Sequence, residues 1–421
     1  MDAEPAGKAG HGTETPESRR ENSIKAESKD TENRDKQNMI ITIVCDVLGE
    51  ENNGTTVAAA NLIRCMKARG HEVRVLCADK ARQNTPGYYV VPELKLLPPI
   101  SNYVAKVGVD IAAPNLKVMK QAMDHADIVH IMTPFLLGTA ALYLARKLHL
   151  PVTAGFHCQA ENFTSHLHLM NLPAANDMTY KVMHDIFYRH VDCIHYPTRF
   201  IRDIYEGKTG SSRGVVISNG VSPLFHSMPA VRPEEYQDRF LILNTGRYAE
   251  EKSQHILLEA VRLSAHEKEI QVFLAGQGPF YDKLKKQGND LTNPPVMALF
   301  SREELAGIAN YADLYVHAAE VDLEAIACLE AISCGLVPVI ADSPRCATKN
   351  FALEKTNLFN VNDPASLAAR IDYWIEHPQE KAAARIAYLE YAKQFRLEHC
   401  MEQMESMMEE TISLFLRQNT K

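Results

Sequence analysis

Apolar, β-branched runs alternate with amphipathic segments in the first half of the chain. Residues 39–47, MIITIVCDV, form a continuous apolar run of the kind found in buried parallel strands. Apolar residues then recur at helical spacing over 57–70, and Gly70 predicts the helix end because glycine readily adopts the left-handed C′ conformation. A second strand is expected over 71–79. The pattern predicts a strand–helix–strand unit with parallel strands.

The same alternation continues along the chain and restarts once. Further strands are predicted at 127–133, 151–157, 192–198, 215–220, 239–247, 270–278, 313–319 and 337–343, and further helices at 116–126, 138–150, 199–208, 252–264, 280–289, 301–312, 364–377 and 397–418. Strands that alternate with helices indicate doubly wound parallel sheets. We therefore predict an α/β protein with two Rossmann-like, doubly wound parallel-sheet domains that face a cleft.

Composition suggests where these domains begin and end. Residues 1–38 are polar and lack an apolar core, so we expect a disordered tail and no secretory signal. The N-terminal Rossmann-like domain is placed at 39–215 and the C-terminal one at 216–400, with the polar, turn-prone segment 231–238 as the candidate linker. A C-terminal helix at 401–421 is expected to pack back on the N-terminal domain.

Composition and charge narrow the class of protein. No apolar run reaches the roughly 18–20 residues that span a bilayer. The nine cysteines are scattered without CxxC or zinc spacing, which favours reduced thiols in a cytosolic protein. The net charge of −8 divides into −2 over 1–39, +3 over 40–215 and −9 over 216–421. The acidic second half argues against nucleic acid as the partner, and the mildly basic first half fits either anionic lipid or ordinary surface charge.

Two candidate ligand sites follow strands of the first half. Gly54, in NNGTT, lies in the first strand-to-helix turn, where a backbone without a side chain admits a ligand or simply makes the turn. His157, in GFHCQAE, ends a predicted strand, and Glu161 follows four residues later, on the same face if a helix has begun. His166 and His168 have no third ligand at convincing spacing, so we predict no metal site.

Two further candidates follow strands of the second half. In TGRYAEEKS, Arg247 and Lys252 lie on a loop that leads into a helix. Two cations beside a helix N-terminus suit a diphosphate and the charge that develops on a diphosphate leaving group. A solvated charged loop is the alternative. Gly276, in GQGP, admits a nucleotide or makes the turn.

The most informative stretch is AEVDLEAIACLEAISCGLVPVIADSP, residues 319–344. We predict a helix from near Asp322 to Cys334, with Gly335 at C′ and Glu330 in mid-helix. Eight residues of helix rise about 12 Å, which is about the span of a sugar nucleotide from hexose to ribose. One carboxylate would accept hydrogen bonds from the sugar and the other from the ribose. An amphipathic helix with salt-bridged glutamates is the alternative.

Together these motifs resemble the retaining glycosyltransferases of family 4, which have the GT-B fold. The match covers about residues 39–415 and consists, in order, of NNGTT…RGHEVRVL, HIMTPFLLGTAAL, GFHCQAE, YPTRFIRDIY, VISNGV, TGRYAEEKS, GQGP and DLEAIACLEAISCGLVPVI. The family signature has two glutamates separated by seven residues, then A-x-x-x-G and a proline that opens a strand. Glu330, Ala331, Gly335 and Pro338 match it.

Asp322 takes the place of the first signature glutamate. This departure leaves Asp322, Glu320 and Glu324 as candidates for the first carboxylate, and it leaves the identity of the hexose open.

The resemblance also implies residue roles. Gly54 would lie under the diphosphate and the leaving sugar, and His157 would contact the sugar near the reacting carbon. Arg247 and Lys252 would hold the diphosphate in place of a metal, and Glu330 would bind the ribose. It implies front-face attack with retention, no enzyme nucleophile, and no cofactor besides the nucleotide-sugar substrate.

The acceptor is inferred from the segment 157–204, which looks most like the diacylglycerol glucosyltransferase-like branch. We therefore expect a hexosyltransferase that uses a UDP-hexose and a lipid acceptor such as diacylglycerol, peripheral on the inner face of the membrane and in contact with it through the N-terminal domain. Candidate docking residues are Lys106, Lys117, Lys120, Lys181, Arg189 and Arg199.

Other hypotheses remain open. They are transfer to a polysaccharide or soluble acceptor, a catalytically silent protein that binds sugar nucleotides, and a UDP-sugar 2-epimerase on the same fold, since a fold does not determine a reaction.

Overall fold

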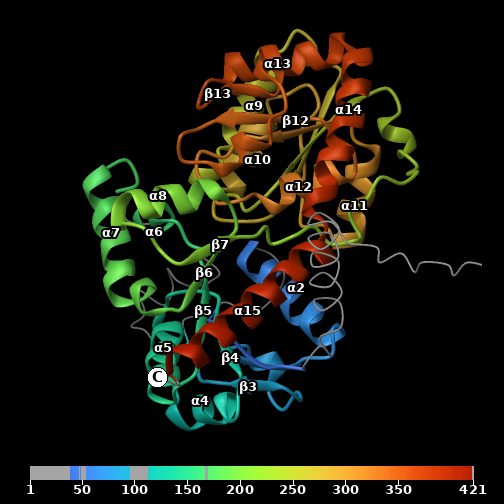
Figure 1. Ribbon diagram of the computed structural model, residues 1–421. Helices are drawn as coiled ribbons and strands as arrows, with labels where there is room; N and C mark the ends of the chain where they lie inside the picture. The colour runs from blue at the N-terminus through green and yellow to red at the C-terminus, as the bar shows by residue number, and fades with distance from the viewer. Residues whose placement is uncertain (1–37, 47, 49–53, 95–111, 166–168, 420–421) are drawn as a thin grey trace, which may run out of the picture. The chain divides into compact units, whose positions relative to one another are not determined.

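The computed structural model describes residues 38–46, 48, 54–94, 112–165 and 169–419, and residues from Ile40 onward form a unit separate from Met1–Met39. The predicted tail at 1–38 lies outside the described residues, apart from Asn38. Within the unit from Ile40, the described residues form a seven-stranded sheet and a six-stranded sheet (Figure 1), and the strand pairs in both are parallel.

The first sheet has the strand order β3-β2-β1-β4-β5-β6-β7. Its strands are β1 (Ile40–Cys45), β2 (Glu72–Cys77), β3 (Tyr88–Val90), β4 (Ile128–Ile131), β5 (Val152–Gly155), β6 (Cys193–Tyr196) and β7 (Gly214–Val216). The helices of this half are α2 (Gly54–Ala68), α4 (Leu116–Met123), α5 (Leu136–Lys147), α6 (Ala160–Ser165), α7 (Pro173–Ile186) and α8 (Arg199–Thr209). The apolar run at 39–47 thus becomes the buried central strand β1, between β2 and β4.

The second sheet has the order β10-β9-β8-β11-β12-β13. Its strands are β8 (Phe240–Thr245), β9 (Ile270–Ala275), β10 (Val296–Ala298), β11 (Leu314–His317), β12 (Pro338–Asp342) and β13 (Leu358–Asn360). Its helices are α9 (Gln254–Leu263), α10 (Tyr281–Gly288), α11 (Arg302–Tyr311), α12 (Ile326–Ser333), α13 (Pro364–Glu376) and α14 (Pro378–Ala392), and α15 (Leu397–Asn419) follows them.

Helix contacts in the second half fall into two groups. Helix α9 packs against α10 and α13, whereas α12 packs against α11 and α14 (Figure 1). Each sheet has its own cluster of buried apolar side chains, one drawn from residues 44–205 and one from residues 221–392. This is the arrangement of two doubly wound domains, and the predicted fold class is confirmed.

The C-terminal helix α15 contacts the first half of the chain. It packs against α2, and Glu405 on α15 binds both Arg69 and His71 at the end of that helix, at 3.2 and 3.0 Å. The candidate linker at 231–238 contains a short 3-10 turn, Glu234–Tyr236.

Several elements were not predicted from the sequence. Strands β3, β10 and β13 are three residues long, too short to show a period, and helix α14 was not expected. No helix in the described part of the chain is long and apolar enough to cross a bilayer.

Candidate active site

The predicted site residues follow the carboxyl ends of parallel strands. His157 lies two residues after β5, Arg247 two residues after β8, and Gly276 directly after β9. Asp322 comes five residues after the end of β11. Because ligands of open α/β sheets bind at the carboxyl ends of the strands, each sheet presents these side chains at its ligand-binding edge.

Lys252 and Asp322 form the closest ion pair in this group. The Lys252 Nζ lies 2.5 Å from Asp322 Oδ2, and both side chains are largely buried. Burial alone would raise the pKa of Asp322, but the charge of Lys252, the neighbouring His317 and the hydrogen bonds from Lys252 and Ala325 together outweigh it, and the pKa is lowered. Burial likewise opposes the charge on Lys252, yet Asp322 raises the pKa of that amine. Both groups are therefore charged at neutral pH, and the ammonium is held in one place.

Arg247 is held by a residue that sequence reasoning overlooked. Its Nη2 donates to Glu251 Oε1 at 2.9 Å, within the loop that ends in the 3-10 turn Glu250–Lys252. Glu251 is buried, and Arg247 keeps the pKa of this carboxyl below its usual value although burial opposes that shift. The backbone of Glu251 also accepts a bond from Glu320 N at 2.8 Å, so this loop is tied to the 319–325 segment. The sequence did contain one indication of this pair, since Arg247 and Glu251 are four positions apart.

The predicted start of the signature helix was wrong. Helix α12 begins at Ile326 rather than near Asp322, because Ala325 is in the left-handed region with φ of 56°. The Asp322 carboxylate accepts the Ala325 N–H at 3.0 Å and so stabilises a turn in place of helix. The estimated helical rise from Asp322 to Glu330 therefore does not apply. The predicted end is confirmed, since Gly335 has φ of 90° just beyond the helix.

The other two candidates for the first carboxylate have different partners. Glu320 binds the guanidinium of Arg345. Glu324 is buried and accepts hydrogen bonds from the Ser218 hydroxyl and from the backbone and side-chain nitrogens of Asn219. Of the three, Asp322 is the one that contacts the predicted diphosphate lysine.

Glu330 occupies mid-helix, as predicted, and is buried. Its Oε1 accepts a hydrogen bond from Arg302 Nη2 at 2.7 Å, and Arg302 begins helix α11. The sequence analysis did not single out Arg302.

The imidazole of His157 packs closely against Gly155. A Cβ added to Gly155 would lie 2.3 Å from His157 Nε2, so the imidazole occupies the space that a side chain at Gly155 would need. The ring also meets His195 edge-on, with centroids 5.5 Å apart. Burial, followed by the neighbouring histidines, holds the pKa of His157 well below its usual value, so the ring is neutral. Among the described residues, His157 Nε2 has no hydrogen-bond partner.

The condition for a common helical face of His157 and Glu161 is not met. Helix α6 begins only at Ala160, so the two residues do not share a helical face. Glu161 is buried and accepts a hydrogen bond from the Tyr180 hydroxyl at 2.9 Å.

The two candidate glycines differ in their surroundings. Gly54 is the first residue of α2, and a Cβ there would meet no described atom within 4 Å, so packing does not demand glycine. The rest of NNGTT before Gly54 lies outside the described residues. A Cβ at Gly276 would come within 2.0 Å of the Gly246 carbonyl oxygen. The close approach of these two turns is therefore reason enough for Gly276, whether or not a nucleotide lies there.

Asp46, which follows β1, was also missed. Its carboxylate accepts the N–H groups of Leu137 and Gly138 at the start of α5, at 3.2 and 3.3 Å. Burial raises its pKa to about 6 despite these hydrogen bonds.

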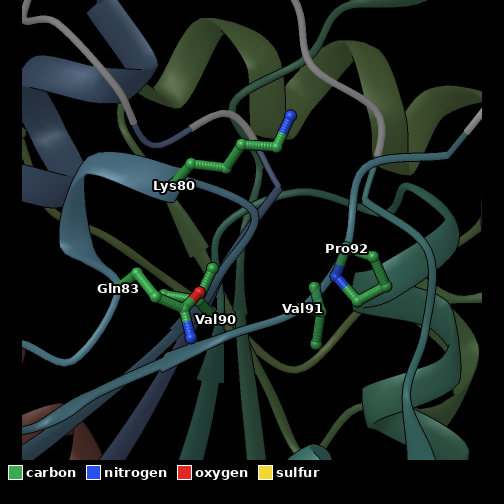
Figure 2. Close-up of a pocket in the computed structure, with 5 residues that line it drawn as sticks. All are labelled: Lys80, Gln83, Val90, Val91 and Pro92. Carbon is green, nitrogen blue, oxygen red and sulfur yellow. The ribbon is translucent and has the colours of Figure 1, made fainter.

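A pocket of about 490 Å³ lies away from these groups. Lys80, Gln83, Val90, Val91 and Pro92 line it (Figure 2), and it contains none of the predicted site residues. Among the described residues, no group of three His, Cys, Asp or Glu side chains is arranged to hold a metal ion. His166 and His168 lie outside those residues.

Comparison with known proteins identifies the class. The family profile described as Glycosyltransferase Family 4 matches residues 52–223, and that described as Glycosyl transferases group 1 matches residues 231–394. The crystal structure of Anabaena HepE in complex with UDP and glucose shares the fold, with a TM-score of 0.69 and 17% identity over 88% of this chain and 100% of that one.

Two relatives give the family context. The chain is 25% identical to the alpha-monoglucosyldiacylglycerol synthase of Streptococcus pneumoniae over 54% of this chain, and the match spans 53% of that protein. It is 24% identical to the GDP-mannose-dependent alpha-mannosyltransferase of Corynebacterium glutamicum over 72% of each chain.

The fold and the two profiles define a GT-B glycosyltransferase. The chain belongs to glycosyltransferase family 4. The predicted family and enzyme class are confirmed.

Proposed function

We propose that this enzyme transfers a hexose from a UDP-hexose to a membrane lipid such as diacylglycerol, with retention of configuration at the anomeric carbon. The observation that carries the proposal is the fixed pair of cations, Lys252 and Arg247, at the carboxyl end of β8. Each cation has a buried or largely buried carboxylate that holds it in place. A diphosphate is the ligand that two such preorganised cations suit best.

In this mechanism Lys252 and Arg247 bind the diphosphate and stabilise the negative charge that develops as it leaves. The bond between the anomeric carbon and the β-phosphate oxygen breaks, and the acceptor hydroxyl forms the new bond on the same face. The hydroxyl proton passes to the departing phosphate oxygen, so no enzyme nucleophile or base is required. We propose that the two cations take the place of a metal ion.

His157 would contact the sugar near the reacting carbon. The ring edge formed by Nε2 and Cδ2 faces Gly155, and the atom opposite that edge of an imidazole is Nδ1. We assign Nδ1 as the atom directed to the sugar. Since the ring is neutral, Nδ1 can act through a hydrogen bond and does not add a positive charge beside the anomeric carbon.

Asp322 would share its carboxylate between Lys252 and the hexose. A carboxylate offers about four lone-pair sites, and Asp322 contacts Lys252, the Ala325 N–H and, at 3.6 Å, His317 Nε2. The side chain is one methylene shorter than the glutamate of the family signature. We propose that this position contributes to the choice of hexose.

A lipid acceptor requires contact with a membrane surface. Helix α7 exposes Met178, Val182 and Ile186 at four-residue intervals, each 46–62% accessible, and Tyr143 of α5 is joined to the end of this row by a hydrogen bond to the Ile186 carbonyl at 3.0 Å. We call these four residues the α5–α7 face. An apolar row of this kind is suited to the interfacial region of a bilayer.

The charges around the α5–α7 face suit anionic lipid. Both acids of α7 are paired, Asp177 with Lys208 and Asp185 with Arg189. Lys147 and Lys181 are exposed and have no carboxylate partner within 4.0 Å among the described residues. Of the other predicted docking residues, Lys117 and Lys120 lie on α4 and Arg199 begins α8, whereas Lys106 lies outside the described residues.

The test is a screen of UDP- and GDP-sugars against diacylglycerol vesicles and soluble glycan acceptors, with products identified by mass spectrometry. The expected product is a hexosyl lipid with an α-linkage when the donor is α-configured. GDP-sugars belong in the screen because one relative is named as GDP-mannose-dependent. Product only on soluble acceptors would contradict the lipid proposal, and UDP binding without transfer to any acceptor would favour a silent binding protein.

A further inference from the structure

We propose that Arg302 is a positioning residue for the donor nucleotide, which acts by orienting Glu330 toward the ribose. The inference rests on the proposed function, in which Glu330 binds ribose hydroxyls. It adds a residue that lies outside the family signature and 28 positions away from Glu330 in the sequence.

Arg302 and Glu330 form a short ion pair between two helices. Arg302 Nη2 lies 2.7 Å from Glu330 Oε1. Glu330 is almost fully buried, whereas Arg302 is about one-quarter exposed. A charge-assisted hydrogen bond of this length holds one carboxylate oxygen in a defined position. The orientation of the whole carboxylate then follows, because its two oxygens are rigidly linked.

Arg302 is itself fixed from two sides. It is the first residue of α11, which begins with a capping box between Ser301 and Glu304. The guanidinium also lies over the ring of Phe225, with its Cζ 4.7 Å from the ring centroid. Phe225 is buried in the core of the second half. A capped helix and an aromatic platform restrict the arginine rotamers, as preorganised binding requires.

Glu330 lies on a second rigid element. Helix α12 packs against α11, so the backbone atoms that carry the two side chains are held relative to each other. Without Arg302, the buried Glu330 carboxylate would lose a charged partner that fixes one of its oxygens. The loss would fall on contacts to the ribose and leave those of Lys252 and Arg247 to the diphosphate unchanged.

The experiment compares binding of UDP and 2′,3′-dideoxyuridine 5′-diphosphate by calorimetry. We expect the wild-type enzyme to prefer UDP by about 10- to 100-fold, as hydrogen bonds to a charged group predict. Arg302→Gln should reduce this preference to a few-fold, by weakening UDP and leaving the dideoxy nucleotide almost unaffected. A merely structural role would weaken both nucleotides alike.

Four further variants complete the test. Glu330→Gln should also reduce the preference, and the double variant should lose little beyond either single one because the two residues act together. Arg302→Lys retains the charge without the planar fork and should keep part of the preference. Arg302→Lys replaces Arg302→Gln in this test if the glutamine variant does not fold. Arg262→Gln is the control, since Arg262 belongs to the same half and its partners are the half-exposed Glu259, the exposed Asp290 and the Gln287 carbonyl.

The outcomes separate this inference from the proposed function. If the wild-type enzyme binds UDP and GDP with no preference for ribose hydroxyls, the role of Glu330 is wrong. If it prefers GDP, the same comparison is made with GDP and its dideoxy form. If the wild-type preference is present and Glu330→Gln removes it, but Arg302→Gln retains it, the inference about Arg302 is overturned and the proposed function stands.

Discussion

The Lys252 ammonium lies 2.5 Å from the carboxylate of Asp322, the residue that takes the place of the first glutamate in the family signature. The two residues are 70 positions apart, and each alters the charge state of the other. In the proposed mechanism this departure from the signature would belong to the diphosphate site, because the shorter acid is paired with the lysine assigned to the diphosphate. In that mechanism the pair would link recognition of the hexose to stabilisation of the leaving group.

Replacement of Lys252 by methionine should lower kcat by about 10²- to 10³-fold, since the variant loses a preorganised charge on the leaving group. It should also reduce the free energy of unfolding, because Asp322 would be left largely buried without its partner. The double variant Lys252→Met/Asp322→Asn should recover the melting temperature while remaining inactive. Steady-state kinetics and thermal unfolding of the three proteins check this. Activity close to wild type in Lys252→Met would contradict the diphosphate assignment.

Gly155→Ala should displace the His157 imidazole, since the new methyl group would lie 2.3 Å from its Nε2. The clash involves the end of a side chain, so the protein should still fold while kcat falls by about 10- to 100-fold through misplacement of the ring. Affinity for UDP should not change, because Arg247, Lys252 and Glu330, the side chains that would bind UDP, lie in the other half of the chain.

The matched control for that variant is Gly207→Ala. Gly207 lies within α8, and a Cβ there would meet nothing within 4 Å. We expect unchanged kinetics and a stability gain of up to about 1 kcal/mol, the difference in helix propensity between the two residues. If Gly155→Ala also left kcat unchanged, the role of His157 beside the sugar would be wrong.

Much of this molecule could be predicted from the sequence, because long apolar runs and helical periods reflect local packing. The strands that carry His157 and Arg247 and the mid-helix place of Glu330 follow from such patterns. The start of α12 could not be predicted in this way. The turn before this helix depends on the hydrogen bond that the Asp322 carboxylate accepts from Ala325 N, and on the left-handed conformation of that alanine. Neither feature alters the apolar pattern.

The partners of the site residues were also beyond prediction. Arg302 reaches Glu330 from another helix, and Glu324 is bound by Ser218 and Asn219, more than 100 positions away. Such contacts join elements that only the tertiary fold brings together. A single sequence contains no signal for them, whereas Arg247 and Glu251 are only four positions apart in one loop.

Glu324 should make stability depend on pH. Burial raises its pKa from 4.5 to about 7, against the effect of hydrogen bonds from Ser218 and Asn219. Between these two values the folded state keeps a proton that the unfolded state loses, so this group disfavours folding increasingly as pH rises from 4.5 to 7. Glu324→Gln removes the effect, and the free energy of unfolding of the variant relative to wild type should rise by about 3 kcal/mol over that range. Denaturant unfolding at several pH values measures it, and a constant difference would contradict the assignment.

The α5–α7 face should determine binding to vesicles. Replacement of Val182 and Ile186 by serine removes two exposed apolar side chains, and loss of their burial in lipid should weaken binding to vesicles of anionic phospholipid by about tenfold or more. Activity on a short-chain, water-soluble acceptor should be unchanged, because neither residue belongs to the site. Ile386→Ser on α14 is the control, since Ile386 is more exposed than either and lies in the second half.

Vesicle sedimentation and size-exclusion chromatography together decide what this face binds. A membrane role predicts loss of sedimentation with no change in elution volume. Lys181→Gln should weaken binding to anionic vesicles and make that binding less dependent on salt. A shift in elution volume with unchanged sedimentation would identify the face as an interface between copies of the chain. The apolar row and the flanking lysines are independent features. Only a lipid surface therefore requires that the serine variant of Val182 and Ile186 and the Lys181→Gln variant both weaken binding, while the catalytic constants on a soluble acceptor remain those of the wild type.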